Sequence, residues 1–332
     1  MGSTRVTIGF PVYNGARFLE ATLAALLVQD LGYFELVVSD NASTDETPAI
    51  LARFAARDRR MRVVRQGANV GASRNFGIVL AEARTPCFLW AAHDDRFAPS
   101  YLRKTLAALD ANPSAVLAVS RVRFIDGDGK PIERLADEPN LHTLGLTRVE
   151  RLRRLFVRRR GVAIYGLGRT ELFRELGMEK PVIGQDLLAL AHLLLRGDVV
   201  QVDEELFDYR IERSKKPADY HRQIGADPAI TQPYTRLFTE AMRMLFASDW
   251  SEPEKEEAFV AAVTTIAREN GAWRRLIARE HFFRVDRLSR RLFASRLCWI
   301  AGRGLAGGTQ LGPQLARQGR LQRAFGSVSS PA

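Results

Sequence analysis

Three polar clusters in the first hundred residues combine carboxylates, amides and hydroxyls, the side chains that bind cations and polar ligands. They comprise residues 11–15, 39–45 and 92–95, and each follows directly on a short apolar run. Any one of them could be only a turn or a helix cap, because Asp, Asn, Ser and Gly are favoured there. Together they indicate a shared site if the segments before them bring their ends to one place.

The apolar runs alternate with amphipathic segments over the first 125 residues. The period of each apolar pattern predicts strands at 6–10, 36–38, 61–64, 87–91 and 116–119, and helices at 17–29, 47–57, 73–83 and 100–111. This alternation predicts an α/β fold with a mostly parallel sheet that is flanked by helices on both faces. Such sheets bind their ligands at the carboxyl ends of the strands, which is where the three polar clusters lie.

The pattern becomes mainly helical after residue 125. It predicts helices at 147–160 and 184–196, a strand that begins at residue 199, and only helices from about residue 231. We therefore expect one domain in two parts, 1–125 and 126–228, followed by a helical C-terminal extension at 229–332. Within that extension, residues 302–332 are rich in Gly, Gln and Arg and are expected to be poorly ordered.

The composition is that of an ordinary globular protein, with 46% apolar and 26% charged residues. The N-terminus leads directly into an apolar strand without the features of a secretory signal, and no apolar run reaches the length of a membrane span. Cys87 lies in an apolar run far from Cys298, so a buried free thiol is favoured over a disulfide. These features predict a cytoplasmic location.

The net charge of +11 is concentrated at the C-terminal end of the chain. Residues 268–332 contain thirteen arginines and three acids, so the remainder is close to neutral. Residues 282–305 fit an amphipathic helix with a cationic face, which would either lie on the anionic inner face of a membrane or pack on the domain with solvated arginines. Nucleic-acid binding is disfavoured because no nucleic-acid-binding motif accompanies the charge. Liposome co-sedimentation of the full chain and of a chain truncated at Arg268 would separate the two readings.

Four segments of the first hundred residues carry a resemblance to a known family. They are Phe10-Pro-Val-Tyr-Asn14, Ser39-Asp-Asn-Ala-Ser-Thr-Asp45, Asn69-Val-Gly-Ala-Ser-Arg-Asn75, and His93-Asp-Asp95 with Pro99 four residues on. In this order and spacing they resemble the motifs of family 2 inverting glycosyltransferases with the GT-A fold, closely over residues 5–125 and more loosely to about residue 215. The resemblance implies transfer of a sugar from a nucleotide-diphosphate donor to a hydroxyl of a saccharide or a lipid-linked saccharide.

The resemblance places the nucleotide at the ends of the first strands. Asp40 would accept a hydrogen bond from the imide N–H of a uracil- or thymine-like base, and the alternative is that Asp40 only caps a turn. Asn41, the next residue, belongs to the same nucleotide-binding set. Arg74 would lie near the base or simply on the surface. The nucleotide-binding set is completed by Pro11, Val12 and Tyr13, which would line the base pocket, and by Asp94. UDP is the favoured nucleotide, dTDP is close behind it, and GDP stays open.

The diphosphate leaving group carries a concentrated charge that a hard divalent cation, Mn²⁺ or Mg²⁺, would neutralise. The resemblance makes Asp95 the first candidate for a direct metal ligand, with Asp94 beside it. His93 and Glu212 are further candidates, although both depart from the family pattern, as does Ala92, which replaces an Asp of many relatives. The cationic side chains that could hold the diphosphate instead are Arg210, Arg213 and Lys215.

Inversion by a single displacement needs a carboxylate that takes the proton of the acceptor hydroxyl. The family places this acid at the start of a helix, and Gly184-Gln-Asp-Leu-Leu188 matches that segment, so Asp186 is the candidate base. The alternative is an acid that only stabilises a helix N-terminus. Two other functions stay open, a sugar-nucleotide-binding protein without catalysis and a nucleotidyltransferase. The second is disfavoured because no Gly-rich phosphate loop follows the first strand.

Overall fold

A computed structural model of the chain describes residues 4–133, 141–157, 161–176, 184–211, 233–281 and 297. The chain divides into two compact units, which are described separately. The first unit comprises residues 1–144, 162–185 and 196–228, and the second comprises residues 145–161, 186–195 and 229–332. The second unit thus includes two segments, 145–161 and 186–195, that precede the predicted extension at 229–332.

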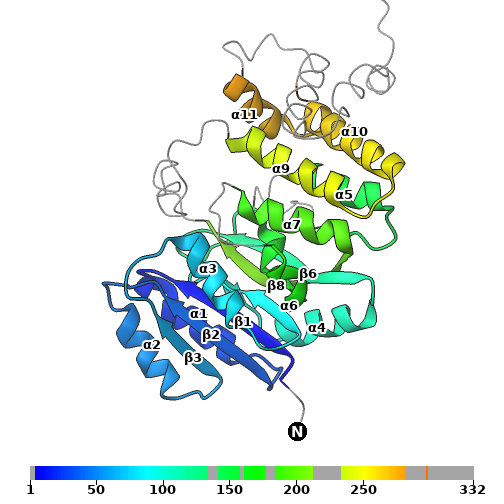
Figure 1. Ribbon diagram of the computed structural model, residues 1–332. Helices are drawn as coiled ribbons and strands as arrows, with labels where there is room; N and C mark the ends of the chain where they lie inside the picture. Colours follow the sequence, from blue (N-terminus) through cyan, green and yellow to red (C-terminus); the bar gives the residue numbers. More distant parts are fainter. Residues whose placement is uncertain are drawn as a thin grey trace, which may run out of the picture. The chain divides into compact units, whose positions relative to one another are not determined.

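The first unit contains an eight-stranded sheet in the order β3-β2-β1-β4-β7-β6-β8-β5 (Figure 1). Its strands are β1 (Val6–Val12), β2 (Phe34–Asp40), β3 (Met61–Arg65), β4 (Cys87–Trp90), β5 (Arg96–Phe97), β6 (Ala115–Ile125), β7 (Leu167–Arg169) and β8 (Asp198–Arg210). Its helices are α1 (Ala16–Leu27), α2 (Thr47–Ala55), α3 (Ala72–Ala81), α4 (Tyr101–Ala111) and α6 (Thr170–Arg174). Every strand and helix predicted before residue 120 is present.

Most neighbouring strands of this sheet are parallel, as predicted. Strand β1 pairs in parallel with β2 and β4, β2 with β3, and β6 with β8. Two short strands depart from this pattern, because β7 is antiparallel to both of its neighbours and β5 is antiparallel to β8. Neither strand was predicted, since two or three residues are too few to show a periodic pattern.

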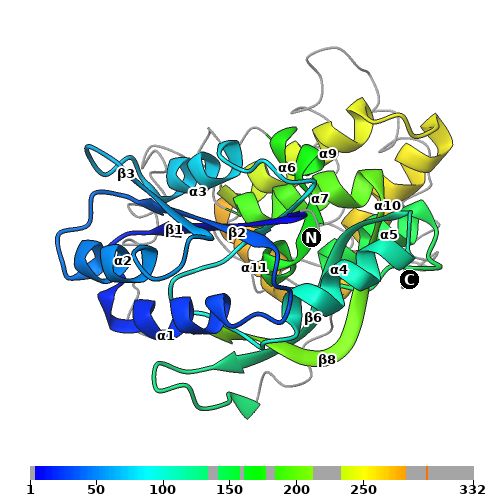
Figure 2. The same ribbon diagram turned by 90° about the horizontal axis from the view of Figure 1, so that it is seen from below.

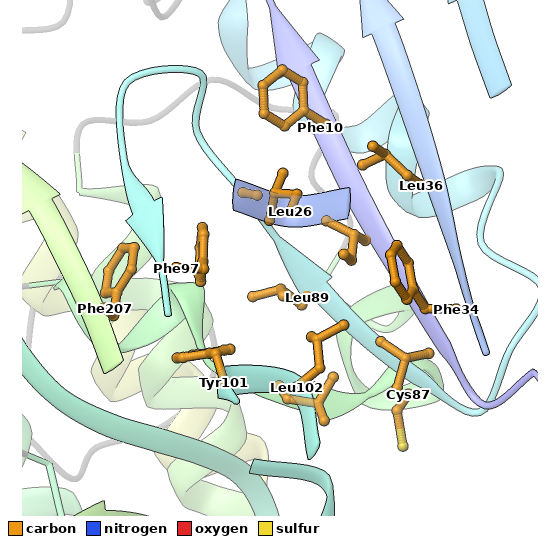
Figure 3. Close-up of a cluster of buried hydrophobic side chains, with 14 of the residues drawn as sticks. Phe10, Leu26, Phe34, Leu36, Cys87, Leu89, Phe97, Tyr101, Leu102 and Phe207 are labelled. Carbon is orange, nitrogen blue, oxygen red and sulfur yellow. The ribbon is translucent and has the colours of Figure 1, made fainter. Parts of the chain in front are cut away.

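The two faces of the sheet are covered by different helices. Figure 2 shows α1 and α2 on one side of β1 and β2, and α3 on the other. The alternation of side chains along β4 follows this division. Leu89 belongs to the main core, where it lies between Leu26 of α1 and Leu102 of α4 (Figure 3). On the opposite face, the ring of Trp90 packs edge-on against Phe173 of α6, with 4.9 Å between the ring centroids.

Gly9, in the middle of β1, lies under the helices of this second face and has no room for a side chain. A Cβ there would lie 2.5 Å from the ring of Phe88 and 2.8 Å from the Val79 side chain. Gly9→Ala is therefore expected to lower the free energy of unfolding by about 1–3 kcal/mol, measured by urea denaturation, because an overpacked core must shift. Gly32→Ala is the matched control, since nothing lies within 4 Å of a Cβ at that position. Equal stability of the two variants would contradict the packing described here.

The second unit is helical, as predicted for the C-terminal part of the chain. Its helices are α5 (Arg148–Val157), α7 (Gln185–Arg196, without its two end residues), α9 (Pro233–Ala247), α10 (Glu252–Arg268) and α11 (Gly271–His281). Phe156 packs at its centre, edge-on against Phe238 and Trp273. Helix α10 begins with a capping box between Ser251 and Glu254.

Several predictions concern residues outside this description. The amphipathic segment 282–305, apart from the buried Leu297, and the C-terminal residues 302–332 are among them. Cys87 is buried and free, as expected, whereas Cys298 is not described. Among the described helices, none has the length and apolar character needed to cross a membrane.

Candidate functional site

The carboxyl ends of β1 and β2 hold the first two polar clusters together, as the sequence analysis predicted. The amide of Asn41 donates to the Val12 carbonyl at 2.9 Å. The amide of Asn14 donates to Ser43 Oγ at 2.9 Å, and the amide of Thr44 donates back to Asn14 Oδ1 at 2.8 Å. Asn14 adopts a left-handed backbone with φ of +48°, a conformation that Asn tolerates better than most residues. The two loops therefore form one rigid rim.

Asp45 connects this rim to the starts of two helices. Its carboxylate accepts hydrogen bonds from the amides of Ala16 and Thr47, at 3.1 and 3.0 Å. Burial raises the pKa of Asp45, but the hydrogen bonds from Thr47 and Ala16 outweigh that effect, so the pKa lies below its ordinary value. An ionised Asp45 thus stabilises the N-terminal ends of α1 and α2.

Asp40, the last residue of β2, has two different carboxylate oxygens. Its side chain is only 1% exposed. Oδ1 accepts a hydrogen bond from the Ser43 amide at 3.0 Å, which is the turn-capping role considered above. Oδ2 is buried and has no hydrogen-bond partner among the described residues, and the nearest cation is Arg65, whose Nε lies 3.6 Å away. The cap therefore uses one carboxylate oxygen and leaves the other without a hydrogen bond, which is uncommon for a buried polar atom.

Two asparagines fix the loops around Asp40. Asn41 donates to Asn69 Oδ1 at 2.9 Å and accepts from the Val70 amide at 2.8 Å, so it ties the loop before α3 to the end of β2. Asn75 is 3% exposed and accepts a 2.6 Å hydrogen bond from Ser39 Oγ. Asn75 is not among the predicted site residues, although a polar residue within the apolar pattern of a helix is a signal that could have identified it.

The remaining predicted nucleotide ligands lie around the same rim. Pro11 and Val12 are buried at the end of β1, and the next residue, Tyr13, is 43% exposed. Arg74 is exposed in the first turn of α3. The structure therefore brings the ends of β1 and β2 together and leaves Arg74 free to be either a base contact or a surface residue.

The third cluster follows β4, the other neighbour of β1, and its two acids are in different environments. Asp95 is 1% exposed, and its Oδ1 accepts the amide of Arg210 at 2.8 Å. Its Oδ2 is buried without a hydrogen-bond partner among the described residues. Burial and the neighbouring Asp94 raise the pKa of Asp95 well above its ordinary range, and the Arg210 amide opposes this. Asp94 is less buried than Asp95.

Arg210 organises this loop through its own side chain. Its guanidinium donates to the carbonyls of Asp94 at 2.8 Å, Asp126 at 2.7 Å and Gly127 at 3.1 Å. It also stacks over the Phe18 ring, 4.4 Å from the centroid. Its Nε and Nη1 are thus engaged with main-chain carbonyls, which disfavours the prediction that Arg210 holds the diphosphate. Arg213 and Lys215 lie outside the described residues.

The predicted metal ligands can be compared with the chemistry of a divalent cation. The described residues hold no group of three or more His, Cys, Asp or Glu side chains that could bind a metal. Glu212 lies outside the described residues. His93 packs against Gly15, and its carbonyl accepts from Thr22 Oγ1 at 2.9 Å. Adjacent carboxylates with one unpartnered buried oxygen fit a cation such as Mg²⁺, which commonly takes one or two carboxylates and completes its shell with phosphate oxygens and water. The Asp94–Asp95 pair fits that arrangement.

Asp186 belongs to the second unit, in the first turn of α7. It is half-buried, and a side chain on residue 161 would overlap its carboxylate, so Gly161 leaves the space that it occupies. Desolvation raises the pKa of Asp186 above its ordinary value, and the amides of Leu187 and of Asp186 itself offset part of that shift. At its other end, α7 is held by Arg151 and Trp250, which donate to the Leu194 and Leu195 carbonyls.

Comparisons with known proteins extend this picture. The chain is 23% identical over 259 residues to EpsH of Bacillus subtilis (strain 168), a match that covers 74% of this chain and 68% of EpsH. The structure of S. aureus TarS 1–349 in complex with UDP-GlcNAc superposes with a TM-score of 0.65 at 16% identity, over 96% of this chain and 92% of TarS 1–349. The mannosyltransferase PcManGT from Pyrobaculum calidifontis, in complex with GDP-Man and Mn²⁺, gives a TM-score of 0.53 at 16% identity, over 95% and 79% of the two chains.

The structural matches confirm the predicted fold, a GT-A-type sheet flanked by helices with a helical C-terminal region. The model of the family described as Glycosyl transferase family 2 matches residues 7–176, which is just over half of the chain. This segment includes all three polar clusters, β1 from its second residue, and strands β2 to β7. The chain belongs to glycosyl transferase family 2.

Proposed function

We propose that the chain transfers a sugar, with inversion, from a UDP- or dTDP-sugar to a hydroxyl of a saccharide or a lipid-linked saccharide. The observation that carries this proposal is the unused oxygen of Asp40, buried at the carboxyl end of β2 beside the Pro11–Tyr13 loop. An imide N–H is a donor of the kind that such an oxygen lacks. The TarS structure, which holds UDP-GlcNAc, supports a nucleotide sugar as the donor.

The diphosphate side of the donor is assigned to the loop after β4. In place of Asp95, the first candidate from the sequence, we propose Asp94 for direct contact with a divalent cation, because its carboxylate is less buried than that of Asp95 and is not needed by the Arg210 amide. Asp95 holds the loop in place and would add its second oxygen. When bound, Mn²⁺ or Mg²⁺ would supply charge neutralisation to the leaving diphosphate. The Mn²⁺ of the PcManGT complex supports this assignment.

Asp186 is the proposed base. An ionised carboxylate would accept the proton of the acceptor hydroxyl as the new glycosidic bond forms. Its raised pKa is the kind of perturbation that general bases often show, although a desolvated helix-start acid would show it too. The alternative is a protein that binds a sugar nucleotide but does not catalyse transfer. Both functions would use the same donor site, so the activity of an Asp186 variant distinguishes them.

Donor binding can be tested through thermal unfolding, because a ligand that binds only the folded state raises its stability. UDP with Mn²⁺ is expected to raise Tm in the wild type, and Asp40→Asn is expected to lose most of that shift while keeping its own unliganded Tm. Asn retains an acceptor for the Ser43 amide but presents an N–H₂ group to the imide. Asp203→Asn, at an 83% exposed position on β8, is the matched control. An Asp40→Asn protein that responds to UDP like the wild type would contradict the proposed base contact.

A further inference from the structure

Arg65 lies beside the unused oxygen of Asp40 and makes two contacts there. It ends β3 and is the direct neighbour of Asp40 in the parallel ladder. Its Nη2 donates to the Ser43 carbonyl at 3.1 Å, and its Nε lies 3.6 Å from Asp40 Oδ2. The side chain nevertheless remains 55% exposed. The exposed guanidinium of Arg65, a hydrogen-bond donor, therefore lies next to the buried acceptor Asp40 Oδ2.

This pairing has a chemical complement among the nucleobases. Uracil and thymine present a carbonyl oxygen next to an imide N–H, so a guanidinium beside a carboxylate matches them group for group. Cytosine presents a lone pair in place of that N–H, and the carboxylate would repel it. Guanine has the matching carbonyl and N–H but adds an amino group, which would need the second oxygen of Asp40. That oxygen already accepts from the Ser43 amide.

We propose that Arg65 is a specificity-determining residue, which reads the carbonyl next to the imide N–H while Asp40 Oδ2 reads the imide itself. This inference rests on the proposed function and names the residue that selects the base. Because Oδ2 is shielded from solvent, a base can reach it only when a neighbouring group moves. Arg65 has the room to turn from the carboxylate toward the base carbonyl.

The test is titration calorimetry of the full chain with UDP, dTDP, GDP and CDP in the presence of Mn²⁺. The wild type is expected to bind UDP and dTDP most tightly, GDP less tightly and CDP least. Arg65→Ala is expected to lose about tenfold in affinity for UDP, the order for one charge-assisted hydrogen bond, and to show no comparable loss for CDP. The ratio of the UDP affinity to the CDP affinity is therefore expected to fall about tenfold in Arg65→Ala. Arg65→Lys keeps a hydrogen-bond donor and should retain part of the preference for UDP.

Arg62→Ala is the matched control, because Arg62 lies on the same strand and is paired with Glu82 at 2.6 Å rather than with Asp40. It should leave the UDP-to-CDP ratio unchanged. If Arg65 had only a structural role, Arg65→Ala would weaken the binding of all four nucleotides alike. An unchanged UDP-to-CDP affinity ratio would therefore overturn the inference and leave the proposed function intact. A wild type that binds none of the nucleotides would overturn both.

Discussion

Asp186→Asn is expected to lower kcat for sugar transfer by about 10²–10⁴-fold, the range that a positioned general base contributes. The replacement has the same shape, and its side-chain oxygen can still accept from the Leu187 amide, which is among the groups that offset the desolvation of the acid. It also removes a charge that burial disfavours, so the folded state should be at least as stable as the wild type. Three measurements separate the effects on stability, donor binding and catalysis. They are thermal unfolding, titration with UDP, and release of UDP in the presence of an acceptor.

The pH dependence gives a second readout of the same residue. A base must be ionised to act, and desolvation raises the pKa of Asp186, so the carboxylate gains its proton at a higher pH than an ordinary aspartate as the pH falls. The acid limb of kcat/KM is therefore expected above the pH at which an exposed aspartate titrates, and the residual activity of Asp186→Asn should lack that limb. In the wild type, activity is retained above the raised pKa and lost as the pH falls through it.

Glu171→Gln provides the matched control for Asp186→Asn. Glu171 is also an acid in the first turn of a helix, α6, but its side chain is exposed. If both substitutions change activity only slightly, Asp186 is a helix-start acid and not the base. If the wild type binds UDP but forms no product with any acceptor, the alternative of a binding protein without catalysis is favoured instead.

The strand ends were predictable from the sequence because periodic apolar runs identify the strands and polar residues mark where they stop. Asp40 and Asn14 come together for that reason. Arg210 shows what this reasoning misses, because its side chain contacts carbonyls that are more than eighty residues away in the sequence. Such contacts depend on the tertiary structure, and local patterns carry no trace of them. The same applies to β7, a three-residue strand that lies between β4 and β6 only because the chain returns to the sheet.

Asp40 also shows that a structural and a functional interpretation of one residue need not exclude each other. A turn cap and a base contact are the two alternatives that the sequence offers for Asp40, and the structure assigns the cap to one oxygen and leaves the second without a hydrogen bond. Asp95 repeats the arrangement in the loop that follows β4, where its first oxygen accepts from the Arg210 amide. In both cases the structural hydrogen bond fixes the direction in which the remaining oxygen points. A structural hydrogen bond and a ligand contact can therefore coexist on one carboxylate.

The division of labour between Asp94 and Asp95 leads to the second large effect. Asp94→Ala is expected to lower kcat/KM by about 100-fold or more, since the cation's stabilisation of the leaving diphosphate amounts to several kcal/mol and each 1.4 kcal/mol is about tenfold. It should also remove the increase in UDP affinity that Mn²⁺ produces, which titration calorimetry measures without any turnover. The unfolding free energy should stay near that of the wild type, because the Asp94 side chain is not the partner of the Arg210 amide.

Asp95→Ala separates this role from a structural one. It removes the acceptor of the buried Arg210 amide, so it is expected to cost about 1–3 kcal/mol of stability in addition to any loss of activity. Asp128→Asn, on the exposed turn that follows β6, also removes one negative charge but leaves the pair itself unchanged, so it should leave the Mn²⁺ effect intact. If Asp94→Ala keeps the Mn²⁺ effect and Asp95→Ala loses it without loss of stability, the buried oxygen of Asp95 is the direct ligand. That result would reverse the assignment made here, because it would mean that the cation reaches a carboxylate that is only 1% exposed in the unliganded protein.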